Sequence, residues 1–224
     1  MRARLQNVYS VRSSFAAGPL ANAHPRGFSG VPMIFFALVA CAPTIAPNDT
    51  AAAVDSGGDS GSSADCGGAD APQIIINEFL ASNKTTNTDN AGEYNDWVEL
   101  YNAGDRIVQM TGFYLTDDPP NPQQWAFPEG VGIAAGDFLI VWCDAQPEQG
   151  TSSELHTNFL LDRKRDDLQL WYYEDEKTCV RKDAVKWTQE QVKDKSAQRV
   201  PDGNEESGAW VLATPTPEEP NHAD

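Results

Sequence analysis

The stretch Trp97-Val98-Glu99-Leu100-Tyr101 decides the fold class of this chain. In an extended backbone, successive side chains point to opposite faces. Val98 and Leu100 therefore share one face, and the other face carries Trp97, Glu99 and Tyr101. This alternation has the period of a β-strand that buries one side, and it does not fit a helix.

The same alternation occurs in residues 167–172, where Leu168, Leu170 and Tyr172 share a face. Between residues 73 and 221, short apolar runs are separated about every eight to fifteen residues by Gly, Pro, Asn and Asp turn signals. This spacing predicts an all-β sandwich or barrel without amphipathic helices. The expected strands cover residues 74–81, 96–102, 111–116, 125–127, 138–143, 157–161, 167–173, 179–187, 197–200 and 210–213.

The first 40 residues have the composition of a secretory signal. Four arginines precede an apolar run at residues 31–40, and no acidic residue occurs in this segment. A run of ten residues is too short to cross a bilayer, which takes about 17–25 apolar residues in a helix. Residues 1–40 are therefore predicted to be a signal peptide that is removed on export.

Leu38-Val39-Ala40-Cys41 resembles the lipoprotein signal of bacteria, in which small residues precede a cysteine that receives lipid. The resemblance implies that Cys41 is lipidated and becomes the mature N-terminus. It also implies an exported protein that is lipid-anchored to a bacterial membrane, at the outer membrane or cell surface. Residues 41–72 are rich in Ala, Gly, Ser and Asp, which predicts a disordered tether.

The net charge argues against nucleic acid as a partner. The whole chain has a formal charge of −17, and all four basic residues of the first 40 lie in the predicted signal peptide. Without that segment, twelve basic and thirty-three acidic residues remain, 12 − 33 = −21. Such a surface repels phosphate backbones. The expected partners are the membrane, through the lipid, and a protein or envelope polymer.

Several fragments in collinear order resemble lamin tail domains of bacterial proteins. They are Ile76-Asn77-Glu78-Phe79-Leu80-Ala81-Ser82-Asn83, Asp96-Trp97-Val98-Glu99-Leu100-Tyr101-Asn102, Thr111-Gly112-Phe113-Tyr114-Leu115-Thr116-Asp117-Asp118, Trp125-Ala126-Phe127-Pro128-Glu129-Gly130, Ile133-Ala134-Ala135-Gly136, His156-Thr157-Asn158-Phe159, Ser196-Ala197-Gln198-Arg199-Val200-Pro201-Asp202-Gly203 and Thr214-Pro215-Thr216-Pro217. The resemblance implies an immunoglobulin-like β-sandwich over residues 73–224. It implies a noncatalytic module for binding or scaffolding, with Trp97 and Tyr101 as candidate surface aromatics. The alternative is an accessory module of a secreted hydrolase, or a weak hydrolase, of the nuclease, phosphatase or esterase class.

A search for catalytic patterns yields no catalytic residue. His156 is the single histidine between the signal region and the C-terminal end, so a Ser-His-Asp site would have to use it. The chain has no Gly-x-Ser-x-Gly elbow and no glycine-rich phosphate loop. One histidine and scattered cysteines do not predict a zinc site. Arg199 is expected to form a structural ion pair with Asp202 or Asp194.

One acidic loop suggests a metal. Residues 89–96 supply the oxygen donors Asp89, Glu93 and Asp96, with Gly92 for bending, and Glu78 and Glu99 are expected on neighbouring strands. Hard oxygen donors suit calcium, but the spacing is not that of an EF-hand. The interpretations that remain open are a solvated loop and a weak calcium site that the domain does not need for folding. No other cofactor is expected.

The four cysteines have separate predicted fates. Cys41 carries the lipid. Cys143 ends one expected strand and Cys179 begins another within the only folded domain of an exported chain, so these two are predicted to form a disulfide. Cys66 is then left over in the tether, free or paired between chains.

Overall fold

The computed structural model describes residues 54–55, 71–206 and 210–223. The predicted signal peptide and Cys41 lie outside these residues. In the described part the chain is all-β, and its only helical element is a 3₁₀ turn, η1, at Pro147–Gln149. No helix there is long and apolar enough to span a membrane.

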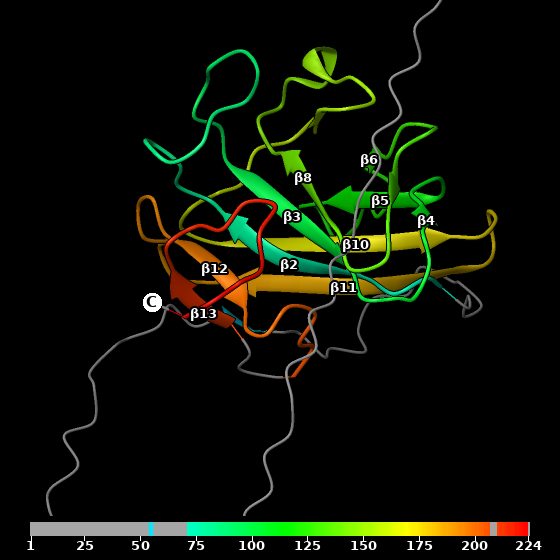
Figure 1. Cartoon of the computed structure of the whole chain (residues 1–224). Coiled ribbons are helices and arrows are strands. Elements are labelled where there is room, and N and C mark those ends of the chain that lie inside the picture. The colour runs from blue at the N-terminus through cyan, green and yellow to red at the C-terminus, as the bar shows by residue number, and fades with distance from the viewer. Residues whose placement is uncertain (1–53, 56–70, 207–209, 224) are drawn as a thin grey trace, which may run out of the picture. The chain divides into compact units, whose positions relative to one another are not determined.

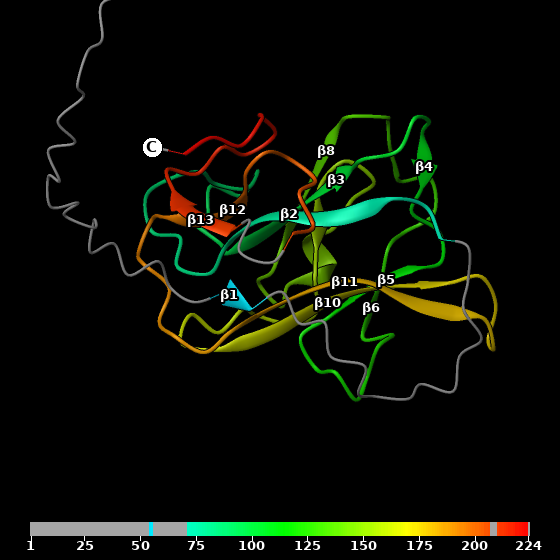
Figure 2. The same ribbon diagram turned by 90° about the horizontal axis from the view of Figure 1, so that it is seen from below.

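Two large sheets form the sandwich (Figure 1). One sheet has the order β1-β11-β10-β5-β6, the other β13-β12-β2-β3-β8-β9, and β4 pairs separately with β7. Figure 2 shows the two large sheets as separate layers. The strands are β1 (Val54–Asp55), β2 (Ile74–Leu80), β3 (Trp97–Asn102), β4 (Val108–Gln109), β5 (Phe113–Thr116), β6 (Trp125–Ala126), β7 (Gly132–Ile133), β8 (Phe138–Trp142), β9 (Leu155–His156), β10 (Asp166–Tyr173), β11 (Cys179–Trp187), β12 (Ser196–Arg199) and β13 (Trp210–Ala213).

The core lies between the two sheets, where the alternating aliphatic residues meet. Val98 and Leu100 are fully buried there, as the alternation predicts, together with Leu168 and Leu170 from the other sheet. Aromatic stacking adds to this packing, because the ring centroids of Phe79 and Trp187 lie 4.5 Å apart. The immunoglobulin-like, all-β prediction is confirmed.

A β-bulge at Asn77 decides which side chains of β2 enter the core. Ile76 pairs with Leu100 and Glu78 pairs with Glu99, so Asn77 is an extra residue on its strand. The extra residue shifts by one position which side chains of the strand face the core. Before it, even-numbered residues such as Ile76 face the core, and after it the odd-numbered Phe79 does so.

The polar backbone atoms next to the bulge are satisfied by a buried ion pair. The Ile76 N–H donates to Asp183 Oδ2 (2.9 Å), and the Ile76 carbonyl accepts from Arg199 Nε (2.8 Å). Arg199 also forms an ion pair with Asp183 at 2.9 Å, and its guanidinium lies 4.6 Å from the ring centre of Trp210. Asp183 is on β11 and Arg199 on β12, so the pair joins the two sheets. The expected ion pair of Arg199 exists, but its partner is Asp183.

The outer face of the six-stranded sheet is also partly apolar. Leu80, Trp97 and Trp142 lie side by side across three strands and form a second buried cluster. Trp97 is 0% exposed, and its Nε1 donates to Asn87 Oδ1 (2.9 Å) from the loop above it. The prediction that Trp97 is a surface aromatic is therefore wrong, because residues 82–96 fold over that face. Tyr101 is half-buried against Phe138.

Most predicted strands differ from the observed ones by one or two residues at a boundary, β4 and β7 were not predicted, and two further differences are larger. Residues 157–161 do not form a strand, because the Thr157 hydroxyl donates to the Phe159 carbonyl (2.7 Å) and closes a local turn in its place. The strand ends earlier, as β9, which pairs in parallel with β8. Upstream, the predicted tether contributes the short strand β1, which pairs with Trp187 and Lys186 of β11. The sandwich therefore includes residues that precede residue 73.

Replacing Asp183 by alanine should destabilise the fold strongly. The change leaves the buried Arg199 charge and the Ile76 N–H without their partner, so we expect the free energy of unfolding to fall by about 3–5 kcal/mol. Urea unfolding measures the difference. Arg106→Ala is the matched control, because the Arg106–Asp105 pair is 87% and 94% exposed. Its cost should be about 0–1 kcal/mol. Equal losses in the two variants would contradict a structural role for the buried pair.

Candidate functional site

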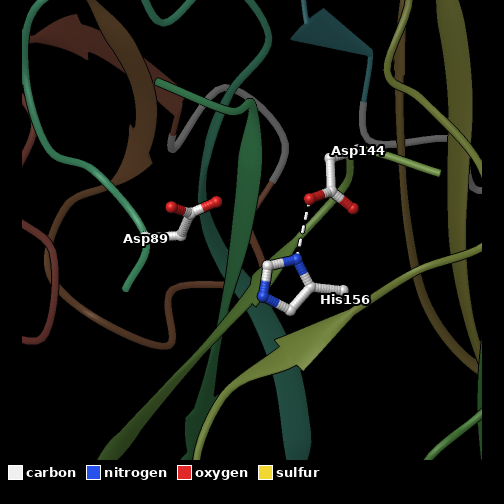
Figure 3. Close-up of side chains that lie close together, drawn as sticks. All are labelled: Asp89, Asp144 and His156. Atoms are coloured by element: carbon white, nitrogen blue, oxygen red, sulfur yellow. Dashed lines mark hydrogen bonds and ion pairs between the residues drawn. The ribbon is translucent and has the colours of Figure 1, made fainter. Parts of the chain in front are cut away.

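Three segments far apart in sequence bring acidic side chains to one histidine. Asp89 lies in the loop between β2 and β3, Asp144 follows β8, and His156 ends β9. One ligand atom from each lies within 4.8 Å of the others, and all three residues are buried. Figure 3 shows both carboxylates on the nitrogen-bearing side of the imidazole ring.

The two ring nitrogens of His156 have different surroundings. Nδ1 lies 2.7 Å from Asp144 Oδ2, and an ionised carboxylate can only accept, which assigns the proton of this bond to Nδ1. Nε2 is buried and has no hydrogen-bond partner among the described residues. The nearest carboxylate oxygen recorded for it is Glu154 Oε2, at 3.8 Å.

Amide side chains hold the carboxylates in place. Asn95 Nδ2 donates to Asp89 Oδ2 (2.9 Å) and to Asp144 Oδ2 (3.1 Å), so it joins two of the segments. Asn90 donates to both oxygens of Glu154, from its backbone N and from Nδ2, at 2.7 Å each. Within the described ranges, no lysine or arginine forms an ion pair with these carboxylates. The carboxylates of the cluster are therefore held by hydrogen bonds, and no lysine or arginine of the described part of the chain forms an ion pair with them.

The five residues predicted as a calcium site do not come together. Asp89 and Glu93 share the loop, where the Glu93 N–H donates to Asp89 Oδ1 (2.9 Å). Asp96 accepts from the Asn83 N–H (2.8 Å). Glu78 and Glu99 lie on β2 and β3, two cross-strand pairs away from Leu80 and Trp97, and the apolar Leu80–Trp97 pair is the next one on the same face. This apolar pair separates the two glutamates from the loop, so the predicted set was wrong as one site. Calcium binding by the loop itself stays a prediction.

Glu78 and Glu99 form a separate buried pair. They are direct cross-strand neighbours, and both are 0% exposed. The C-terminal segment covers them, since the Thr216 N–H donates to Glu78 Oε1 (3.0 Å) and the Glu218 N–H donates to Glu99 Oε2 (2.6 Å). Burial, with a smaller contribution from the neighbouring Glu78 charge, raises the pKa of Glu99 from 4.5 to about 8. The pKa of Glu78 is also raised by burial.

The surroundings of His156 do not contain the remaining parts of a hydrolase triad. The Asp144–His156 bond matches the orienting half of such a triad. In the described part of the chain, no serine, threonine or cysteine side chain contacts Nε2 through a hydrogen bond. The ring is 1% exposed, so a substrate has no direct access to it. The arrangement supplies ligands for a cation better than it supplies a nucleophile.

The predicted disulfide between Cys143 and Cys179 was wrong. Cys143 is a free, buried cysteine, whereas Cys179 is disulfide-bonded, so the two are not partners. Burial raises the pKa of the Cys143 thiol, and the Asp166 carboxylate lies near enough to raise it further. Asp166 begins β10, and Cys179 pairs with Tyr173 at the other end of that strand. Seven residues of strand separate these ends by about 23 Å. A disulfide needs a Cα separation of about 4.4–6.8 Å. Cys143, near one end of β10, is therefore too far from Cys179, at the other end, to form one.

Glu99→Gln should change how stability depends on pH. Between pH 4.5 and about pH 8, Glu99 holds its proton in the folded state and loses it on unfolding. The stabilisation from the raised pKa is complete below pH 4.5 and is lost as the pH rises to about 8, at about 1.4 kcal/mol per pH unit. The glutamine keeps an oxygen for the Glu218 N–H and cannot ionise, so its stability should fall less over this window.

Unfolding in urea at pH 5, 6.5 and 8 measures this difference in slope. Glu129→Gln is the matched control, because Glu129 is exposed. The control should follow the wild-type slope. Parallel curves for wild type and Glu99→Gln would show that Glu99 ionises normally in the folded protein.

Comparison with known proteins identifies one family. The Lamin Tail Domain family matches residues 68–189. No curated protein and no solved structure matches the chain. The family match ends before β12 and β13, so those two strands are assigned to the sandwich by their pairing with β2 and with each other.

Proposed function

Because the chain belongs to the lamin tail domain family, we propose that it is an exported, noncatalytic binding or scaffolding module that is anchored to a membrane by lipid on Cys41. The family supports the general role, since its immunoglobulin-like domain serves binding or scaffolding. The anchor rests on Leu38-Val39-Ala40-Cys41 and the apolar run before it. Two or more acyl chains, at about 0.8 kcal/mol per buried CH₂, hold a domain stably on a bilayer.

The observation that carries the binding role is the joining of two loops into one surface. Hydrogen bonds from Asn90 to Glu154 and from Asn95 to Asp144 tie residues 82–96 to residues 144–156. Gln146 adds a third link by donating to Glu93 Oε2 (3.1 Å). Loops held in this way by a rigid sandwich are common sites of recognition. Tyr94, on the first loop, is 48% exposed and offers an aromatic contact.

The charge of the chain restricts the partner. The part that follows residue 40 has a formal charge of −21, which favours a basic or neutral partner over an anionic one. We propose a protein or an envelope polymer, and we exclude nucleic acid on this electrostatic ground.

Cys41→Ala should release the protein from membranes. The substitution removes the thiol that receives the lipid, so the chain should move from the membrane pellet to the soluble fraction. Fractionation followed by intact mass measurement tests this. Ser62→Ala is the matched control, because it changes the same segment and leaves every cysteine in place, and it should stay with the membranes. A Cys41→Ala protein that still sediments with membranes, together with a wild-type mass that shows no acyl chains, would contradict the anchor.

The full chain should show no turnover on a panel of esterase, nuclease and phosphatase substrates. His156 lacks a nucleophile partner among the described residues and is closed to substrates, so hydrolysis has no basis in the described site. If the chain is instead a weak hydrolase, it should turn over at least one of these substrates. Turnover that His156→Ala abolishes, while His222→Ala leaves it unchanged, would overturn the noncatalytic proposal.

A further inference from the structure

His156 keeps one buried ring nitrogen without a partner. The residue is 2% exposed, and Nε2 has no hydrogen bond within the described ranges. The Glu154 carboxylate, at 3.8 Å, is too far away for a hydrogen bond. A buried polar atom without a partner is destabilising, and such an atom calls for a ligand or another specific explanation. Glu154 Oε2, 3.8 Å away, is an acceptor and cannot donate to the lone pair of Nε2, so a cation is the partner that fits both groups.

One oxygen donor lies at a distance from this nitrogen that suits a small metal ion. Zinc binds imidazole nitrogen at about 2.0–2.1 Å and carboxylate oxygen at about 2.0–2.2 Å, so two ligand atoms of one ion lie at most about 4.2 Å apart. The 3.8 Å between Nε2 and Glu154 Oε2 is already inside this limit. Asp89 has an oxygen within 4.8 Å of one of the two ring nitrogens, so it would have to move toward Nε2 to share an ion with it.

The side chains around these donors already hold them in a metal-binding orientation. A histidine that binds metal usually donates its other N–H to a carboxylate, which is the relation of Nδ1 to Asp144. Asp89 is fixed by the Glu93 N–H and the Asn95 amide. Glu154 is fixed by two donors of Asn90. Each carboxylate oxygen that accepts one of these hydrogen bonds retains a second lone pair for a metal.

We propose that His156 Nε2, Glu154 and Asp89 bind a divalent transition-metal ion of the zinc class, with Asp144 orienting the imidazole. Imidazole nitrogen favours zinc-class ions, whereas calcium takes six to eight oxygen ligands. The three carboxylates have no lysine or arginine ion pair among the described residues, and a dication would offset their charge. This site does not depend on the lipid anchor or on the proposed binding role.

The test is a calorimetric titration of the full chain after chelation, with zinc chloride and with calcium chloride. We expect one zinc ion per chain and at least about tenfold weaker binding of calcium. His156→Gln should abolish the zinc isotherm. Asp144→Asn should weaken zinc binding by about 10–100-fold, the usual effect of removing a group that orients a ligand. Thermal melting should show an increase of the melting temperature with zinc in wild type and no increase in His156→Gln.

Two matched variants control for other sites. His222→Gln removes an exposed imidazole, and Asp105→Asn removes an exposed carboxylate, so both should bind zinc as wild type does. If His156→Gln does not fold, Glu154→Gln replaces it, since Glu154 lies at the half-buried rim of the site. Circular dichroism establishes that each variant is folded. Absence of zinc binding, equal binding by wild type and Glu154→Gln, or tighter binding of calcium than zinc would each overturn the proposal.

Discussion

The bulge at Asn77 is the constraint on which the rest of the sandwich depends. An extra residue in β2 turns Phe79 toward Trp187 in the core and turns Glu78 to the outer face. The N–H and carbonyl of Ile76, next to the bulge, bond to side chains. Asp183 and Arg199 take these two groups, and because the acid and the base come from different sheets, the same contact fixes how the sheets meet.

Because the bulge places Glu78 on the outer face of the six-stranded sheet, that face carries a glutamate pair that the C-terminal segment covers. Glu78 stands beside Glu99 there, and neither carboxylate reaches water. The backbone N–H groups of Thr216 and Glu218 bind them and hold the C-terminal segment in place. A raised pKa of Glu99 follows from this covering and not from the sheet itself. The C-terminal segment thus covers the glutamate pair. Burial removes the water that would solvate a charged carboxylate, and a proton on Glu99 removes the need for that solvation.

The loops carry the features that distinguish this chain from a generic sandwich. The family match covers residues 68–189 of the sandwich, and fold alone does not assign a function. The connection between β2 and β3 meets the one after β8, and their amide and carboxylate side chains surround His156. A metal ion there would tie the two loops more firmly, next to Tyr94 on the same surface. In this domain the loops would then recognise the partner, and the two sheets would supply the rigid support for them.

The sequence by itself determined the all-β class, because the alternation of residues such as Val98 and Leu100 is a local property of an extended chain. Collinear fragments likewise indicated the family. The sequence did not show that Trp97 is buried, that Cys143 is free or that Asp144 binds His156. Those facts depend on a loop that folds over the sheet and on contacts between residues at least 10 positions apart in the chain. Tertiary structure alone decides such contacts, because local patterns specify which face a residue takes and not which distant segment covers it.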